Sequence, residues 1–499
     1  MNLTEKLREH AVERAEQAAL VDRHRGRDRV LTFGGLDRQV DAVARGLADA
    51  GYRPGERVLV FHPVSLELYV FLLACFRAGV VAVLADPSGG REFLSVVCRR
   101  ARPKGFFGPL KARLFRWLIP EMRRLPVVGM GAGSGSGPEF ASHDGGDGHP
   151  ALLTFTSGST GEPKGAVRTH GFLLNQHRAL EESLELRAGE VDLITLPVFA
   201  LANLASGLTS VLADGDLGRP GEVDPVRVAG QIRRLEVTRV TAAPAFFEAM
   251  LVGGMPGSVR KVFTGGAPVF PDFLERLDGT GAEVTVVYGS TEAEPISELP
   301  YREWRPEWLE RIAEGAGLPV GRAVCDVAVL PDRFGEPLMA MTEEEFAGMC
   351  LGVGGRGEVL VAGPQVLEGY LDGRGDEETK VRVGERVWHR TGDAGWLDDA
   401  GCLWMLGRCP ARVRAGERMC YPLEVEAAMR VAHPGLRCAL VEVGGRGALV
   451  VEGECAADVR DMSGRLGIER VIPLAKIPMD RRHQSKVDYV RLRAALGGE

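Results

Sequence analysis

The chain has 499 residues, so two or more domains are expected, because a single hydrophobic core stops growing well below that length. Its residues are 45% hydrophobic and 26% charged, as in an ordinary globular protein, and a formal net charge of −7 argues against nucleic-acid binding. Nine cysteines occur without a Cys-x-x-Cys pair or a His/Cys ligand spacing, which argues against structural zinc and a disulfide framework and favours a reducing cytoplasm.

The N-terminal residues, MNLTEKLREHAVERAEQAALV, form a charged, amphipathic helical pattern without the apolar region or cleavage site of a signal peptide. The next apolar segment, Leu68 to Asp86, is close to the length of a membrane span. Arg77 and Gly79 interrupt it, and its second half is a β-branched run that ends in Asp86. We therefore predict a buried helix followed by a buried strand, and no membrane span.

Four segments share one arrangement, in which an amphipathic helix leads through a glycine or turn to a β-rich strand. They cover residues 43–63, 68–86, 226–244 and 273–289. This alternation predicts an α/β protein whose sheets are largely parallel and buried. From residue 408 the chain changes to a short compact block, so we predict a large N-terminal domain, residues 1–407, and a small C-terminal domain, residues 408–499.

A basic amphipathic stretch, KARLFRWLIPEMRR, covers residues 111–124. It has two interpretations: a surface that docks a membrane, a partner or a long-chain ligand, or a solvated helix packed by Leu114, Trp117 and Leu118. Residues 129–150, which are rich in Gly and Ser, predict a solvated loop.

The segment TFTSGSTGEPKG, Thr154 to Gly165, concentrates hydroxyls, glycines and one lysine. It is not a Walker A loop, because Pro163 directly precedes Lys164 and no Gly-Lys-Ser/Thr follows. A strand-like run, ALLTF, enters it and a second run, GAV, leaves it, so it is not a linker. A turn between two strands that offers N–H groups, hydroxyls and a cation is suited to binding phosphate oxygens.

A second glycine motif has the spacing G-x-G-x-x-G, at Gly352, Gly354 and Gly357. It precedes a strand instead of joining a strand to a helix, as a dinucleotide-binding loop does. We interpret it as a turn.

Further motifs follow the Thr154 loop in order: GGAP at 265–268, YGSTE at 288–292, HRTGDAGWLDDAG from His389, LGR at 406–408, and Lys486 in DRRHQSKVDY. Together they resemble the adenylate-forming superfamily, which includes acyl-CoA synthetases, peptide-synthetase adenylation domains and firefly luciferase. The resemblance covers essentially the whole chain. It implies an α/β fold with a large N-terminal domain of α/β sheets and a small, mobile C-terminal α+β lid.

The activity implied by this resemblance is the formation of an acyl adenylate from ATP and a carboxylic acid, with Mg²⁺. A carboxylate must attack the α-phosphorus, so two anions must be brought together while pyrophosphate leaves. By resemblance, the β and γ phosphates are held by Thr156, Ser157, Gly158, Ser159, Thr160, Gly161 and Lys164. The adenosine is bound by Gly265, Gly266, Ala267, Pro268, Tyr288, Gly289, Ser290, Asp393 and Arg408, with Asp393 accepting from both ribose hydroxyls. Thr291 bonds the α-phosphate, Glu292 ligates Mg²⁺, and Lys486 stabilises charge on the α-phosphate and the carboxylate.

Within the superfamily, four segments resemble the β-lactone synthetases of bacterial long-chain olefin biosynthesis. They are residues 196–211, 219–225, 288–297 and 477–488. This resemblance implies a long-chain β-hydroxy acid as substrate, closure of its adenylate to a β-lactone, and an association with other olefin-pathway enzymes that is left open. The acyl pocket is expected between Phe199 and Thr209, where Gly207 would leave room for chain atoms; the alternative for this segment is a core helix.

The sequence predicts the formation of the adenylate more firmly than the product into which the adenylate is converted. In a long-chain fatty acyl-CoA or carrier-protein ligase the lid rotates and a thiol attacks, and the hinge is usually an Asp or Lys two residues after the conserved arginine. Here that position is Pro410. Proline fixes φ and restricts the residue before it, which favours a chemistry that needs only the closed state.

A third interpretation belongs to another class, a non-catalytic relative that binds nucleotide or an acyl chain as a partner subunit. Ser485, where Gly usually precedes the lid lysine, leaves room for it. The intact phosphate-binding, Mg²⁺-binding, ribose-binding and lid residues argue against it.

Overall fold

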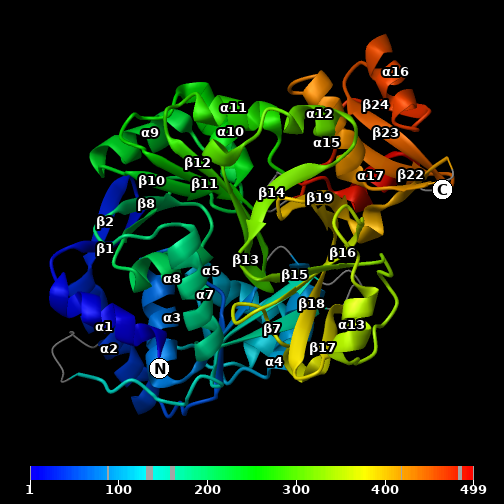
Figure 1. Ribbon diagram of the computed structural model, residues 1–499. Coiled ribbons are helices and arrows are strands. Elements are labelled where there is room, and N and C mark those ends of the chain that lie inside the picture. Colours follow the sequence, from blue (N-terminus) through cyan, green and yellow to red (C-terminus); the bar gives the residue numbers. More distant parts are fainter. Residues whose placement is uncertain are drawn as a thin grey trace. The chain divides into compact units, whose positions relative to one another are not determined.

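The computed structural model describes residues 2–86, 89–130, 139–157, 163–416, 418–480 and 486–497. The fold is mixed α/β (Figure 1). The chain divides into two compact units. Unit 1 comprises Met1–Ala213 and Pro364–Glu377, and unit 2 comprises Asp214–Gly363 and Glu378–Glu499.

One sheet of unit 1 has the strand order β5-β3-β4-β6-β7. Its strands are β3 (Arg57–Val60), β4 (Val81–Ala85), β5 (Gly105–Phe107), β6 (Pro150–Ser157) and β7 (Pro163–Thr169). The first four pair in parallel, and β7 returns antiparallel to β6. Unit 1 also contains the order β8-β9-β1-β2, formed by β1 (Ala18–His24), β2 (Arg27–Thr32), β8 (Val191–Ile194) and β9 (Thr209–Leu212).

The helices of unit 1 connect these strands. They are α1 (Leu3–Glu13), α2 (Phe33–Asp49), α3 (Leu66–Ala78), α4 (Gly90–Ala101), α5 (Leu110–Phe115), the 3₁₀ turn η2 (Arg116–Leu118), α6 (Pro120–Arg123), α7 (His170–Ser183), α8 (Val198–Ala205) and η5 (Leu371–Gly373), while α14 (Asp376–Thr379) runs across the unit boundary in the sequence. Gly79 ends α3 with φ 70°, a left-handed conformation that favours glycine. The buried helix and strand predicted for residues 68–86 are thus confirmed as α3 and β4.

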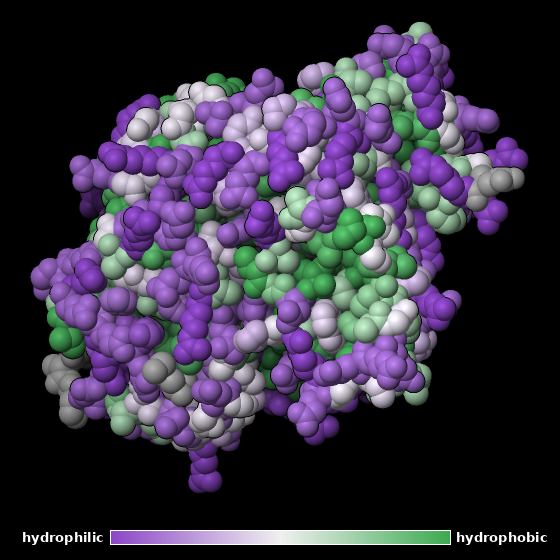
Figure 2. Space-filling view, viewed as in Figure 1, coloured by the Kyte–Doolittle hydropathy of each residue, from purple (hydrophilic) through white to green (hydrophobic). Residues whose placement is uncertain are grey.

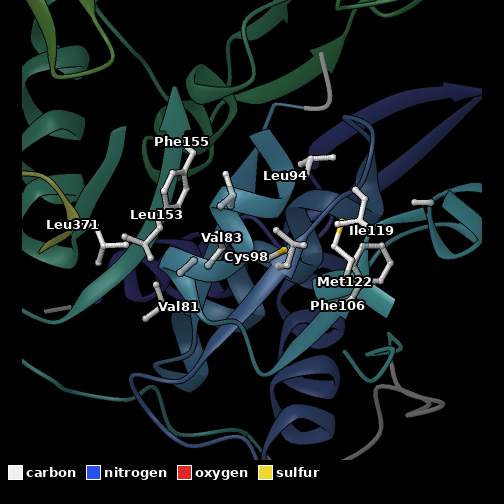
Figure 3. Close-up of a cluster of buried hydrophobic side chains, with 14 residues drawn as sticks. Val81, Val83, Leu94, Cys98, Phe106, Ile119, Met122, Leu153, Phe155 and Leu371 are labelled. Carbon is white, nitrogen blue, oxygen red and sulfur yellow. The ribbon is translucent and has the colours of Figure 1, made fainter. Parts of the chain in front are cut away.

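The hydrophobic core around β3, β4 and β6 fixes the position of β6, the strand that enters the Thr154 loop. Figure 3 shows Leu153, Phe155 and Leu371 on one side of this cluster and Ile119 and Met122 beside Phe106 on the other. Gly165 faces Phe155 across the hairpin, and a Cβ at Gly165 would lie 3.0 Å from the Phe155 ring and 3.2 Å from the Leu371 Cβ. A side chain at Gly165 would therefore force the Phe155 ring or Leu371 to shift by a few tenths of an ångström.

The basic stretch 111–124 packs differently from the helical interpretation. Leu114, Trp117 and Leu118 were expected to be its core contacts, and this is wrong, because all three are exposed. Its buried residues are Ala112, Ile119 and Met122. The stretch is also broken into α5, η2 and α6. The side that meets the core is therefore not the side that carries Leu114, Trp117 and Leu118.

Unit 2 carries the order β15-β16-β18-β19-β14-β13-β12-β11-β10, with β17 paired to β18. Its strands are β10 (Arg239–Ala242), β11 (Lys261–Gly265), β12 (Glu283–Ser290), β13 (Ala293–Pro300), β14 (Leu318–Ala323), β15 (Asp326–Leu330), β16 (Gly357–Ala362), β17 (Lys380–Val383), β18 (Arg386–Leu397) and β19 (Cys402–Arg408). Strands β10, β11 and β12 are parallel, whereas the pairs from β12 onward are antiparallel. The expected parallel pairing therefore holds where helices separate the strands.

The helical elements of unit 2 before residue 408 are η3 (Pro220–Glu222), α9 (Pro225–Arg234), α10 (Pro244–Gly253), α11 (Pro271–Asp278), η4 (Tyr301–Glu303), α12 (Trp308–Ala313) and α13 (Glu343–Met349). The surface over α9, α10 and α11 is mainly hydrophilic or intermediate in Figure 2. Apolar residues on their inner faces, such as Ile232, Phe247 and Leu277, are buried, as amphipathic helices on a sheet require, whereas Val226 on α9 and Val252 on α10 are exposed.

The last part of unit 2, here called the C-terminal block, runs from residue 409 to 497. It contains η6 (Cys409–Ala411), β20 (Val413–Ala415), β21 (Arg418–Cys420), α15 (Pro422–Ala432), β22 (Cys438–Val443), β23 (Arg446–Glu452), α16 (Ala457–Arg465), β24 (Arg470–Leu474) and α17 (Tyr489–Ala495). It has hydrophobic clusters of its own on the two faces of the β22-β23-β24 sheet. The predicted boundary between residues 407 and 408 stays a prediction.

The four predicted helix–strand segments are confirmed as α2–β3, α3–β4, α9–β10 and α11–β12. The G-x-G-x-x-G motif is a turn before β16, as interpreted.

The N-terminal pattern is helical only to Glu13, because Ala18–His24 pair with both β2 and β9. In the part of the chain that is described, no helix combines the length and the apolar character needed to cross a membrane.

The close approach of β11 to β12 gives a test of the fold. A Cβ at Gly265 would lie 2.1 Å from the Val287 carbonyl oxygen, so Gly265→Ala should separate the two strands and lower the free energy of unfolding by about 1 to 3 kcal/mol. The measurement is the urea midpoint of the purified chain. Gly348→Ala is the matched control, because a Cβ at this helical glycine meets no atom within 4 Å, and it should not lower the midpoint. Equal midpoints for parent and Gly265→Ala would contradict the strand contact.

Candidate functional site

The Thr154 loop joins β6 to β7 in a hairpin of unit 1. Thr156 pairs with Lys164 and Ser157 with Pro163, so the hairpin is closed at the base of the loop. The expected phosphate ligands Gly158, Ser159, Thr160 and Gly161 lie outside the described residues, as do the side chains of Thr156 and Ser157. The strand–turn–strand interpretation of the sequence is confirmed for the flanking strands.

Lys164 lies against a segment that is distant in the sequence. Its side chain is largely buried, and its Nζ lies 5.9 Å from the centroid of the Tyr370 ring. A Cβ at Gly375 would lie 2.8 Å from the Lys164 Cδ, and Gly375 has φ +103°. The lysine stem therefore packs where only a glycine fits, and residues 370–375 fix its direction.

Arg100 on α4 ties the hairpin to that same segment. Its guanidinium donates to the carbonyl oxygen of Pro163 and, at 2.8 Å, to that of Leu371. Ala166 of β7 also forms an isolated bridge with Tyr370. Sequence reasoning missed Arg100, Tyr370 and Gly375, because none of them belongs to a recognisable motif.

In unit 2, Asp393 on β18 faces Arg408 on β19, and the structure brings both together with Tyr288 of β12. The Arg408 Nη1 donates to the Asp393 Oδ1 at 2.9 Å, and the Tyr288 hydroxyl donates to the Oδ2 at 2.7 Å. The Asp393 backbone N–H donates to the Thr391 Oγ1 at 3.0 Å. Both oxygens of the carboxylate are thus oriented by protein donors.

The electrostatics keep this arrangement in one protonation state. Burial, with the neighbouring Asp393 carboxylate, raises the pKa of Tyr288 well above its ordinary value. The Asp393 carboxylate also raises the pKa of Arg408. Tyr288 is therefore a neutral donor and Arg408 a cation. A carboxylate has about four lone-pair directions, so the Asp393 oxygens keep capacity for two further hydroxyl donors, as the expected ribose contact needs.

The other expected adenosine residues follow the carboxyl ends of β11 and β12. These two strands are parallel neighbours, with Gly265 opposite Val287, so the Gly265–Pro268 loop and Tyr288 lie at one edge of the sheet. Gly266 has φ +80°, which turns the chain away after β11. Adenine binding between these residues stays a prediction.

Thr291 and Glu292 form the turn between β12 and β13. The Ser290 Oγ accepts from the backbone N–H groups of Glu292 and Ala293, each at 3.2 Å. Gly289 is closely packed, since a Cβ there would lie 3.1 Å from the Ala293 carbonyl oxygen. The turn that carries the expected Mg²⁺ ligand is therefore held by its own side chains.

Lys486 lies in the C-terminal block at an exposed position. Its backbone N–H donates to the Asp480 Oδ1 at 3.0 Å, and its carbonyl oxygen accepts from the Asp480 N–H at 2.8 Å. These bonds fix the chain at this point, while residues 481–485 lie outside the described residues. Its role as the lid lysine stays a prediction.

The expected acyl-pocket segment forms α8, and Phe199 is buried there. Gly207 has φ +76°, and a Cβ at this position would lie 3.0 Å from the His10 ring and 3.1 Å from the Ala188 Cβ. These contacts account for a glycine at 207 without an acyl chain. They agree with the core-helix alternative, and the pocket role of Phe199 and Gly207 stays a prediction.

Comparison with known proteins identifies the class. Residues 7–371 match the family model of AMP-binding enzymes, and this is well over half of the chain. The chain belongs to this adenylate-forming family, and it is an AMP-forming ligase that uses ATP to activate an acyl group.

Its relatives include two olefin β-lactone synthetases. The one from Stenotrophomonas maltophilia is 33% identical over 98% of this chain and 97% of its own length. The one from Xanthomonas campestris pv. campestris is 33% identical over 93% of this chain and 90% of its own. A feruloyl-CoA synthase from Amycolatopsis is 31% identical over 83% of this chain and 80% of its own.

Solved structures share the fold. ATP-bound MatB from Rhodopseudomonas palustris has a TM-score of 0.80 at 23% identity, with 100% of this chain and 99% of that chain covered. The O-succinylbenzoate coenzyme A synthetase MenE from Bacillus subtilis, in complex with AMP, has a TM-score of 0.76 at 21% identity, with 99% and 98% covered. The architecture of a large sheet domain and a small C-terminal domain is the one expected from the sequence.

The Asp393 contacts give a binding prediction. Asp393→Ala should weaken ATP binding about tenfold to a hundredfold, because hydrogen bonds to a charged group contribute about 1.5 to 3 kcal/mol. Tyr288→Phe, which removes only the bond to Oδ2, should weaken it about fivefold. Calorimetric titration with ATP measures both. Tyr301→Phe, elsewhere in unit 2, is the control. Unchanged ATP affinity in Asp393→Ala would show that the ribose is bound elsewhere.

Proposed function

We propose that this ligase activates a long-chain β-hydroxy carboxylic acid with ATP and Mg²⁺ and then closes the acyl adenylate to a β-lactone. The observation that carries the proposal is the 33% identity to olefin β-lactone synthetases over nearly the whole chain. The oriented Asp393 carboxylate and the buried Lys164 support the nucleotide-binding half of the reaction.

In the first step, a carboxylate oxygen bonds to the α-phosphorus and the bond to the pyrophosphate leaving group breaks. Lys164 and the loop residues would bind the leaving phosphates, and Asp393 would hold the ribose. Lys486 would stabilise the charge that develops between the two anions. Thr291 would donate to an α-phosphate oxygen.

Glu292 is the residue we propose as the Mg²⁺ ligand. No cluster of three or more His, Cys, Asp or Glu residues that could hold a metal ion occurs in the described part of the chain. One carboxylate suits Mg²⁺, because this ion is usually held by one or two carboxylates together with substrate phosphates. When bound, it would shield the negative charge of the phosphates.

In the second step, the β-hydroxyl oxygen of the substrate bonds to the acyl carbon, the acyl–phosphate bond breaks, and AMP leaves as the hydroxyl proton is lost. The nucleophile is attached to the acyl group, so no second substrate has to enter. Cleavage of the mixed anhydride offsets the strain of the four-membered ring.

The hinge region supports a reaction that is completed in one lid orientation. Pro410 lies in the 3₁₀ turn η6, just before Arg412. The Arg412 Nη1 donates to both Asp332 carboxylate oxygens at 3.1 Å, and the Tyr421 hydroxyl donates to the Oδ2 at 2.8 Å. Rotation of the C-terminal block about this turn would break these bonds and strip a largely buried carboxylate of its partners.

The second candidate is a thioester-forming ligase for a long-chain acid. The likeness to feruloyl-CoA synthase, 31% identical over 83% of this chain, favours it. It would share the first step and the residues that bind the nucleotide. The two candidates differ only in the nucleophile of the second step, so the product decides between them.

The lid lysine can be tested in either case. Lys486→Ala should lower the rate of pyrophosphate release about a hundredfold or more while ATP binding is retained, because the lysine acts on charge in the transition state. Stopped assays of pyrophosphate and calorimetry with ATP measure the two quantities. Lys476→Ala removes another exposed lysine of the C-terminal block and should leave both unchanged. Parent-like pyrophosphate release from Lys486→Ala would remove this residue from the mechanism.

The product can be tested with a long-chain 2-alkyl-3-hydroxy acid, ATP and Mg²⁺. AMP should be released without CoA, and mass spectrometry should find the substrate minus one water whether or not CoA is added. The same acid without the 3-hydroxyl is the matched control; it should give pyrophosphate but no dehydrated product. AMP release that depends strictly on CoA, with acyl-CoA as product, would instead establish the thioester-forming reaction.

A further inference from the structure

An exposed apolar patch lies on the short helical segment that follows β5 in unit 1. It consists of Leu110, Leu114, Trp117 and Leu118, whose exposed fractions are 70%, 64%, 61% and 52%. Leu110 and Leu114 lie one turn apart on α5, and Trp117 and Leu118 follow on η2. We call these four residues the apolar patch.

The patch is not needed for the core. The other side of the segment already packs into the cluster of Figure 3 through Ala112, Ile119 and Met122. One buried face is sufficient to hold a surface helix on a protein. A second apolar face left in water costs free energy without stabilising the fold, which indicates a contact made with something outside the chain.

Positive charge surrounds the patch. Lys111, Arg113, Arg123 and Arg124 are exposed, and the one acidic residue of the stretch, Glu121, forms an ion pair with Arg99 at 2.9 Å. The Arg116 guanidinium lies 5.4 Å from the centroid of the Trp117 ring. The apolar patch therefore lies in a basic stretch of a chain whose formal net charge is −7. Its partner must accept both apolar side chains and cations.

We propose that the apolar patch inserts into the interface of a lipid bilayer that contains anionic headgroups, and that this holds the enzyme on the membrane surface. Leucines with a tryptophan at the headgroup level and basic residues beside them are what such an interface binds. A second copy of the chain is a poorer occupant, because a twofold contact of the patch with itself would bring the basic residues of both copies together. The proposal holds for either product of the adenylate.

The experiment is co-sedimentation of the full chain with phosphatidylcholine vesicles, with and without phosphatidylglycerol. The parent should pellet with the anionic vesicles and less with the neutral ones. Leu114→Ser/Trp117→Ser and Lys111→Gln/Arg123→Gln/Arg124→Gln should each lower the partition coefficient about a hundredfold or more. Val226→Ser/Val252→Ser, which changes two exposed valines of unit 2, is the control and should bind as the parent does.

Two further measurements separate docking from misfolding and from other contacts. Pyrophosphate release with a water-soluble acid should be the same in all variants. Bromolipid quenching of tryptophan fluorescence should be lost in Trp117→Phe although this variant still pellets. The proposal is overturned if the parent does not pellet with anionic vesicles, if both patch variants pellet as the parent does, if quenching persists in Trp117→Phe, or if the serine variant only dissociates a dimer.

Discussion

The paired Asp393 carboxylate is the contact on which the proposed nucleotide site of unit 2 depends. It joins three strands through side chains, because Tyr288 comes from β12 and Arg408 from β19, while Asp393 itself lies on β18. A buried carboxyl group is tolerated only when its oxygens are paired, and these two donors pair both of its oxygens. Tyr288 lies near the end of β12, which leads into the turn of Thr291 and Glu292, and Arg408 ends β19 directly before η6 at the start of the C-terminal block. The Asp393 side chain therefore links the strands that lead to the turn of Thr291 and Glu292 and to the C-terminal block, where we propose the ribose, Mg²⁺ and lid contacts.

The C-terminal block is fixed to the rest of unit 2 by a second set of ion pairs. Asp332 accepts from Arg412 and Tyr421, and Asp272 accepts from Arg430 at 2.6 Å. Each pair includes a carboxylate with little exposure, so removal of a partner would cost more than at the surface. A lid that rotates freely would lack these buried contacts with the rest of unit 2. The block is held in the described orientation by contacts at its start and on α15.

Local sequence patterns predicted the parts of the fold that local physics decides. The helix–strand segments follow from periodicity and from glycines such as Gly79, and the hairpin around the Thr154 loop follows from two β-rich runs. Arg100 could not be found in this way, because its partners lie 63 and 271 positions away. The bond between Tyr288 and Asp393 spans 105 positions, and although both residues stand in recognised motifs, their mutual contact is set by strand order. The basic stretch has two apolar sides, and the sequence alone does not tell which side meets the core.

The fate of the adenylate depends on which nucleophile reaches the acyl carbon first, because the residues that we propose to bind the nucleotide would serve a lactone and a thioester equally well. A hydroxyl attached to the acyl chain needs no encounter with a second molecule, and this advantage offsets part of the strain of the four-membered ring. A thiol must enter from solution, and a lid that rotates makes room for it. At the hinge we propose at Pro410, the bonds of Asp332 to Arg412 and Tyr421 oppose the rotation that an entering thiol would need, and they do not oppose attack by a tethered hydroxyl. The chemical difference between the two products is therefore expected at the hinge and the acyl pocket more than at the nucleotide site.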